Sequence, residues 1–294
     1  LLAFIESFLK NILEYIAVTF FFLLFKLLGL KLSSLFGGIV FYLYGLFSKR
    51  NYIAKKNILK AFPKISKQEL NNIISKMWFH FGRVIGEYPN LNKIKLGRKN
   101  NIIIENEKNL INPLKKYSNC LFFSAHIGNW ELTSHLLIQK GFKINFIYRA
   151  PNNHLVDNIL RKIRFSYGVD LIRKGNQGAK QCLKILNSKG GHIGMLIDQK
   201  MNDGISTKFF GETVKSPSAI AKFALKFHCP IIPAVCFREN STNFRISYAK
   251  PITPNELKRI GNEKEIMNYL NNYVEIWIKK KPEQWIWFHN RWNN

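Results

Sequence analysis

Acidic residues are scarce in this chain. Its 294 residues contain 18 Asp and Glu against 45 Lys and Arg, which gives a formal net charge of +27 at pH 7. An excess of this size favours an anionic partner, such as nucleic acid, a membrane surface or an acidic small molecule or protein. Lys, Asn and Ile are abundant throughout the chain. The charge therefore permits an anionic partner without establishing one.

Cysteines and nucleotide-binding motifs are also sparse. The cysteines are scattered, with no CxxC pair and no His/Cys cluster at zinc spacing, and they are Cys120, Cys182, Cys229 and Cys236. This pattern predicts buried free thiols in a reducing compartment and no metal site. The segment GNQGAK (residues 175–180) lacks the spacing of a phosphate-binding loop, and no GxSxG nucleophile elbow occurs. We expect neither a tightly bound cofactor nor a serine nucleophile.

Low-complexity linkers and internal repeats are absent, and a hydrophobic content of 47% excludes general disorder. Candidate strands cover residues 119–125, 143–150, 169–174, 191–198, 230–238 and 243–252. Candidate helices cover residues 131–140, 153–167, 178–190, 216–227 (with Ser216 as its cap) and 263–285. This alternation predicts an α/β fold with one sheet that is covered by helices on both faces.

The first fifty residues are far more apolar than the rest. Tyr15–Leu30 carries only Lys26 as a charge, and a second uncharged stretch covers residues 32–47. Sixteen helical residues span about 24 Å, less than the roughly 30 Å of a bilayer core, so a spanning helix would extend back past residue 15. The chain begins at Leu1 and not at Met, so we also expect residues before it.

Two interpretations of this N-terminal region compete. Either the first stretch anchors in a membrane and the second lies along its surface, or both form a buried helical hairpin. A basic cluster follows, which is typical of a cytoplasmic membrane flank, and it contains Lys49, Arg50, Lys55, Lys56 and Lys60. We therefore predict a membrane element over residues 1–50 and a catalytic domain over residues 51–294. That domain would begin with an amphipathic helix capped by Ser66, which stands three residues before Glu69.

The segment LFFSAHIGNWE (residues 121–131) places an ionisable pair directly after a hydrophobic run. On a continuous helix His126 and Glu131 would point roughly 140° apart, so they could meet only across a turn. Gly128 provides the permissive backbone for such a turn. A histidine oriented by a carboxylate is suited to general-base catalysis on a substrate hydroxyl. Spacing alone leaves open a second interpretation, in which both side chains bond only to the loop backbone.

Several ordered blocks resemble the bacterial lipid A biosynthesis acyltransferases, which belong to the wider glycerolipid acyltransferase superfamily. The first block is the strand followed by His-x4-Glu, and Glu131 in place of the commoner Asp favours the lipid A branch. The later blocks are YRAPNN (148–153), LIRKGNQG (171–178), MLIDQKMNDG (195–204), KFFGETVKSP (208–217) and PEQWIWFHNRW (282–292). The last of these matches the family's ending closely. The resemblance implies a mixed α/β sheet with an N-terminal membrane-associated helix.

The resemblance also implies an activity. Family members transfer a fatty acyl chain from acyl carrier protein to a hydroxyl of an acylated lipid A precursor, at the cytoplasmic face of the inner membrane. His126 and Glu131 would be the catalytic pair, without metal or cofactor. Substrate-binding residues would be Arg149, Arg164, Arg173 and Asp198. The partners would be the acidic carrier protein, a phosphorylated glycolipid and anionic lipid, with no nucleic acid.

Arginines at strand and helix ends can converge on one edge of a sheet and bind phosphates bidentately. The other interpretation for each of the three arginines is a solvated surface side chain. Asp198 ends an apolar strand, where it could orient a sugar or an arginine, or merely cap a turn. The remaining histidines and the aromatic C-terminal segment are expected to serve packing.

Two alternatives to this function stay open at this point. One is acylation of a different phospholipid or glycolipid. The other is a basic, membrane-tethered protein that binds lipid or nucleic acid without catalysis.

Overall fold

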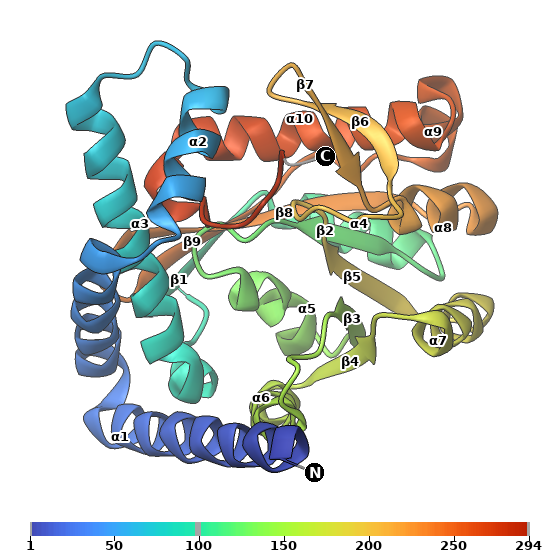
Figure 1. Cartoon of the computed structure of the whole chain (residues 1–294). Helices are drawn as coiled ribbons and strands as arrows, with labels where there is room; N and C mark the ends of the chain where they lie inside the picture. Colours follow the sequence, from blue (N-terminus) through green and yellow to red (C-terminus); the bar gives the residue numbers. More distant parts are fainter. Residues whose placement is uncertain (1, 98–100, 293–294) are drawn as a thin grey trace.

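A computed structural model of the chain describes residues 2–97 and 101–292. Its centre is a seven-stranded sheet in the order β1-β9-β8-β2-β5-β3-β4 (Figure 1). The strands are β1 (Ile102–Glu105), β2 (Leu121–Ser124), β3 (Ile144–Tyr148), β4 (Val169–Arg173), β5 (His192–Leu196), β8 (Ile231–Asn240) and β9 (Asn243–Tyr248). Strands β8, β2, β5, β3 and β4 are mutually parallel, whereas β9 runs antiparallel to β8 and pairs in parallel with β1. The predicted mixed α/β fold is confirmed.

Helices cover both faces of the sheet, because its central strands are apolar on both sides. In β2, Leu121 and Phe123 enter one core, whereas Phe122 enters a second core on the opposite face. The helices of the α/β region are α4 (Glu107–Lys116), α5 (His135–Gln139), α6 (His154–Ser166), α7 (Asn176–Asn187), α8 (Ala219–Phe227), α9 (Pro254–Ile260) and α10 (Glu263–Lys280). The 3-10 segments are η1 (Tyr88–Lys93), η2 (Trp130–Ser134) and η3 (Pro282–Gln284). The four cysteines are free and buried, as predicted.

Two local predictions are corrected. Ser216 does not cap a helix: it is the last residue of β7 (Glu212–Ser216), which forms a hairpin with β6 (Ile205–Phe209). The Ser216 hydroxyl accepts a hydrogen bond from the buried Arg291 guanidinium at 2.8 Å, and α8 begins after Ser218. The continuous helix expected from residue 131 to 140 is divided into η2 and α5.

Two helices connect the N-terminal region to the sheet, namely α2 (Asn51–Ala61) and α3 (Lys67–Glu87). The predicted cap of α3 is confirmed, since the Ser66 hydroxyl accepts a hydrogen bond from the Glu69 backbone N–H at 3.1 Å. The C-terminal aromatic residues pack in the core, as expected: Trp285 and Trp287 are fully buried. Phe288 stacks on Trp78 of α3 with ring centroids 4.7 Å apart.

The first helix, α1 (Leu2–Phe47), contains both apolar stretches and bends sharply between them (Figure 1). Gly29 adopts φ 70° and ψ 177°, a conformation that favours glycine and interrupts the helical hydrogen bonds. The Asn90 side-chain amide donates to the Phe25 carbonyl at 2.9 Å. Phe25 is the residue four positions before the bend, so Asn90 satisfies a carbonyl that the bend releases.

The second half of α1 packs closely on α3 through small residues. A Cβ atom added to Gly82 would lie 2.2 Å from the Gly37 carbonyl oxygen, and one added to Gly86 would lie 2.1 Å from the Ser33 carbonyl oxygen. The two backbones therefore touch, as in helix pairs whose interface consists of small residues. Residues 30–47 therefore pack directly on α3, a helix of the predicted catalytic domain.

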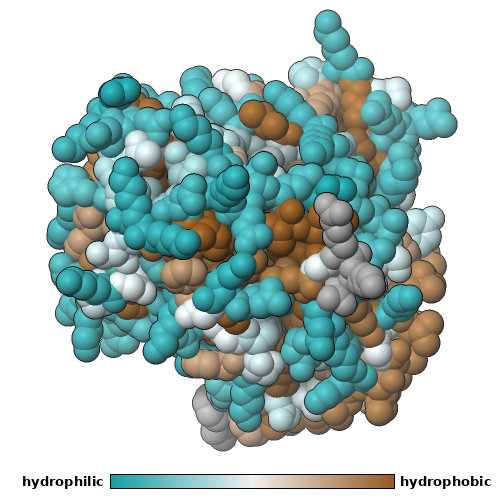
Figure 2. Space-filling model, turned by 180° about the vertical axis from the view of Figure 1, so that it is seen from behind, coloured by the Kyte–Doolittle hydropathy of each residue, from teal (hydrophilic) through white to brown (hydrophobic). Residues whose placement is uncertain are grey.

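The outward side of α1 is apolar and exposed, with Phe20, Leu27 and Leu43 among its accessible side chains. Figure 2 shows this brown surface along the lower right edge of the molecule, the side on which α1 lies. In the described part of the chain, one helix, Glu6–Phe47, is long and apolar enough to cross a membrane. Its exposure excludes the buried-hairpin interpretation.

We predict that Gly86→Ala destabilises the packing of α1 on α3. The new methyl group would meet backbone atoms that cannot rotate away, so the free energy of unfolding should fall by about 1–3 kcal/mol. Thermal unfolding in detergent micelles measures this change. Asn72→Ala, on the exposed side of the same helix, is the matched control, and equal midpoints for the two variants would contradict the prediction.

His192, at the start of β5, is buried and accepts a hydrogen bond on Nδ1 from the Cys120 backbone N–H at 3.1 Å. Burial lowers its pKa from 6.5 to about 4. Between these two values the unfolded chain binds a proton that the folded chain does not bind, so stability falls as the pH decreases through this window.

We predict that the free energy of unfolding of the wild type falls by about 2 kcal/mol more than that of His192→Asn between pH 7 and pH 5. Asparagine retains an acceptor for the Cys120 N–H but cannot be protonated. Urea unfolding of both proteins at the two pH values measures the difference. Parallel pH profiles would refute the role assigned to His192.

Candidate active site

The centre of the site lies at the carboxyl ends of β2 and β5. These neighbouring parallel strands pair Ser124 with Leu196, so the residue two positions beyond each strand is His126 on one and Asp198 on the other. His126 Nδ1 lies 2.9 Å from Asp198 Oδ1, and the His126 backbone N–H donates to Asp198 Oδ2 at 3.0 Å. The imidazole is partly accessible, whereas the carboxylate is fully buried. This edge of a parallel sheet is where α/β proteins commonly place their sites.

Asp198 is ionised in spite of its burial. Burial alone would raise the pKa of its carboxyl, but the electrostatic effect and hydrogen bond of His126 and the hydrogen bond from Trp285 hold that pKa well below its usual range. Trp285 Nε1 donates to Asp198 Oδ2 at 2.7 Å. The carboxylate accepts the Nδ1 proton of His126, so the neutral imidazole presents Nε2 as its basic nitrogen. Among the described residues, no group bonds to Nε2.

Glu131 does not orient His126, and the predicted pairing of these two side chains is corrected. Glu131 accepts two hydrogen bonds from Arg164, from Nε at 3.0 Å and from Nη2 at 2.6 Å. Tyr167 and the Trp130 indole donate to the same carboxylate at 3.0 and 3.2 Å. The turn forms as expected, but the two side chains point apart: His126 contacts Asp198, and Glu131 contacts Arg164. Asp198 takes the place that the spacing assigned to Glu131.

The ion pair of Glu131 and Arg164 is enclosed by protein. Burial would raise the pKa of Glu131, but the Arg164 charge and the hydrogen bonds from Arg164, Tyr167 and Trp130 lower it on balance. The guanidinium lies over the rings of Tyr88 and Tyr148, with centroid distances of 5.5 and 5.8 Å. Bidentate pairing between flat aromatic rings fixes both side chains. The pair therefore holds the end of the His126 turn (residues 126–131) against α6.

The C-terminal PEQW segment holds the His126 turn from the other side. The Gly128 backbone N–H donates to the Gln284 carbonyl at 3.1 Å, and Ile127 forms a β-bridge with Trp285. Gly128 has φ 57°, and an added Cβ would lie 1.8 Å from the Cys236 carbonyl oxygen. Only glycine fits this position. The Gln284 side chain in turn bonds the Arg238 backbone N–H and carbonyl at 2.9 and 2.8 Å.

The three arginines predicted to converge are placed differently. Arg164 is engaged by Glu131, so its guanidinium is not available to a phosphate. Arg149 follows β3 and is exposed, and Arg173 at the end of the neighbouring β4 is 62% exposed and bonds Asp157 at 3.2 Å. Since Tyr148 pairs with Arg173 in the sheet, Arg149 and Arg173 lie at one edge. Arg149 and Arg173 are therefore the accessible members of the three predicted arginines.

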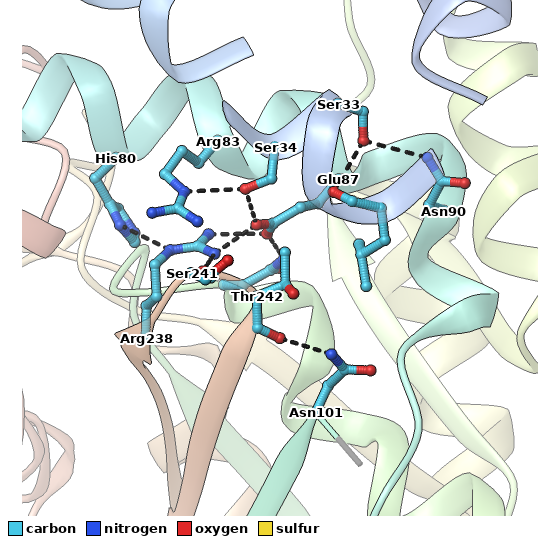
Figure 3. Close-up of polar contacts among 12 residues, drawn as sticks. Ser33, Ser34, His80, Arg83, Glu87, Asn90, Asn101, Arg238, Ser241 and Thr242 are labelled. Atoms are coloured by element: carbon cyan, nitrogen blue, oxygen red, sulfur yellow. Dashed lines mark hydrogen bonds and ion pairs between the residues drawn. The ribbon is translucent and has the colours of Figure 1, made fainter. Parts of the chain in front are cut away.

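Sequence reasoning missed a buried polar cluster beside this turn. Arg238 of β8 forms two hydrogen bonds to Glu87, the last residue of α3, and one of these joins Nη2 to Oε2 at 2.8 Å (Figure 3). Glu87 is fully buried and Arg238 is 5% exposed. A glutamate at the C-terminal end of an amphipathic helix gives no signal of such a contact.

The central strands β2 and β5 of this mixed α/β sheet thus end beside a histidine–aspartate pair. The family model of the bacterial lipid A biosynthesis acyltransferases matches residues 6–294. The chain belongs to this family, and the family supports acyltransferase activity. No curated protein matches the chain significantly.

We predict that Asp198→Asn lowers kcat for acyl transfer by on the order of 10³-fold. The amide cannot stabilise a charged imidazole, and its NH2 group would face the donors Trp285 Nε1 or His126 N–H. Asp203→Asn, in the exposed loop that follows, is the matched control. Initial-rate kinetics on variants with wild-type thermal midpoints measures the effect. Similar kcat values for the two variants would exclude Asp198 as the partner of His126.

Proposed function

We propose that the protein transfers a fatty acyl chain from an acyl carrier protein thioester to a hydroxyl of an acylated lipid A precursor. The observation that carries this proposal is the geometry of His126: Nδ1 is held by a buried aspartate, and the ring is partly accessible. A histidine held in this way is suited to accepting a proton from a substrate hydroxyl. Family membership supports the acyl transfer.

The reaction needs no covalent enzyme intermediate. His126 Nε2 takes the proton of the acceptor hydroxyl. The oxygen of that hydroxyl then attacks the thioester carbonyl carbon. The tetrahedral intermediate, stabilised by backbone N–H groups or an arginine, collapses and breaks the carbon–sulfur bond. The carrier thiolate then receives the proton from the imidazolium. Among the described hydrogen bonds of His126 there is none to a serine or cysteine, which favours direct transfer.

The substrate contacts are assigned by chemistry. Arg149 and Arg173 suit phosphates of the glycolipid, since they are exposed at one edge of the sheet. A cavity of about 300 Å³ lies between α1, α2 and α3, and Leu46, Ile74 and Trp78 in its wall suit an acyl chain.

A location at the inner membrane is supported by α1 and by the basic residues after it. The apolar side of α1 would enter the inner membrane, and Lys49, Arg50 and the lysines of α2 would face anionic lipid at the cytoplasmic surface. The same basic surface would attract the acidic carrier protein. In this arrangement residues 1–50 anchor the chain, and residues 51–294 carry out catalysis.

We predict that His126→Ala lowers acyl transfer by on the order of 10³-fold or more, because the general base is lost. The assay supplies purified protein with acyl carrier protein thioester and lipid A precursor, and follows the acylated product. His154→Ala, an exposed histidine at the start of α6, is the matched control and should keep wild-type activity. Undiminished transfer by His126→Ala would disprove the mechanism.

Two outcomes with the wild type would redirect the proposal. No transfer to the lipid A precursor, together with transfer to a different phospholipid or glycolipid, would change the acceptor while retaining the chemistry. Binding without turnover that weakens steeply with salt would instead indicate a non-catalytic basic protein.

A further inference from the structure

Glu87 occupies a position that stability alone does not explain. It is a fully buried carboxylate at the C-terminal end of α3, where a negative charge opposes the helix dipole. Its partner Arg238 is also buried, and an apolar pair of the same size is often at least as stable as a buried ion pair. Figure 3 shows that side chains from α1 and β8 converge on this carboxylate of α3.

The two oxygens of Glu87 bind different parts of the molecule. Oε1 accepts a hydrogen bond from the Ser34 hydroxyl of α1 at 2.6 Å. Oε2 accepts one from the Asn129 side-chain amide at 2.8 Å. Ser34 and Asn129 are both fully buried. One carboxylate therefore joins the apolar N-terminal helix to the turn that carries His126.

On the α1 side, the contact depends on how α1 lies against α3. Ser34 lies in the stretch where the two helix backbones touch, and its hydroxyl also accepts a hydrogen bond from Arg83 Nε at 2.9 Å. Burial, and next the charge of Arg238, lower the pKa of Arg83 to about 10. Two guanidinium groups thus crowd one carboxylate, and a displacement of α1 would remove a donor from Glu87.

On the site side, Asn129 stands between His126 and Glu131 in the chain. Arg238 reaches the same turn by a second route, since its backbone bonds Gln284, which accepts the Gly128 N–H through its carbonyl. A shift of the Glu87–Arg238 pair would therefore move the His126 turn from two directions. Catalysis by a positioned base is sensitive to displacements of about 1 Å.

We propose that Glu87 is a positioning residue that couples the packing of α1 on α3 to the geometry of the His126 turn. Acyl transfer at His126 then requires that the second half of α1 be packed on α3. The loss of activity expected here rests on the proposed function, whereas the structural link between α1 and the His126 turn does not.

The test compares two adjacent buried serines of α1. Ser34→Ala removes the bond to Glu87, whereas Ser33→Ala removes a hydroxyl that bonds Leu30 and Asn90 and does not bond Glu87. We expect Ser34→Ala to lower kcat by about tenfold at nearly unchanged KM, and Ser33→Ala to leave kcat within about twofold. Hydrogen–deuterium exchange of residues 126–131 should accelerate about tenfold in Ser34→Ala alone. Equal kcat and equal exchange in the two variants would overturn the proposal.

A double-mutant cycle tests whether the effect passes through Glu87. Ser34→Ala and Asn129→Ala remove opposite ends of the same link and leave Arg238 paired with Glu87. If the link is real, the fold-loss of kcat in the double variant should be smaller than the product of the fold-losses in the two single variants. Multiplicative effects would show that the two residues act independently and would overturn the coupling.

The exchange measurement separates this inference from the proposed function. An inactive wild type with faster exchange of residues 126–131 in Ser34→Ala would disprove the proposed activity and support the coupling. An active wild type with unchanged exchange and unchanged kcat in Ser34→Ala would support the proposed activity and disprove the coupling.

Discussion

The parallel pairing of β2 and β5 is the constraint on which the site depends. It sets the positions that follow Ser124 and Leu196 side by side, and so brings an imidazole to a carboxylate from residues 72 positions apart. Asp198 is buried, so its charge must be satisfied by donors within reach. Trp285 supplies one of them, which is why the C-terminal PEQW segment has to fold back over the sheet before the site is complete.

Two buried carboxylates near one histidine have separate tasks. Asp198 holds Nδ1 of the imidazole, whereas Glu131 fixes the end of the turn through Arg164. Both are held ionised against burial by the donors around them. The course of the turn explains why the two carboxylates differ in role. The turn through Gly128 directs the Glu131 side chain toward α6 and leaves His126 at the strand end. The effect of substituting either carboxylate therefore depends on the hydrogen-bond donors around that carboxylate.

Much of this arrangement could be predicted from local sequence. Six of the seven strands of the central sheet, the helix cap at Ser66 and the apolar N-terminal stretches follow from periodicity and capping residues, and His126 and Asp198 were both identified as strand-end residues. Their contact could not be predicted, because nothing in either segment specifies that β2 lies next to β5. The same reason hid Glu87 and Arg238, which are 151 positions apart in the chain. The β6–β7 hairpin was missed because Ser216 before a Pro resembles a helix start.

The N-terminal helix has two features that conflict unless they are separated along its length. An apolar exterior suits lipid, but a helix held only by lipid would not have a fixed position relative to the sheet. Small residues at Gly37, Gly82 and Gly86 give α1 and α3 a close contact that lipid cannot replace, and Ser34 places a polar group at that contact. The Gly29 bend, satisfied by Asn90, then directs the first half of α1 away toward α6. The part of α1 that touches the catalytic machinery is therefore the part whose position the protein itself determines.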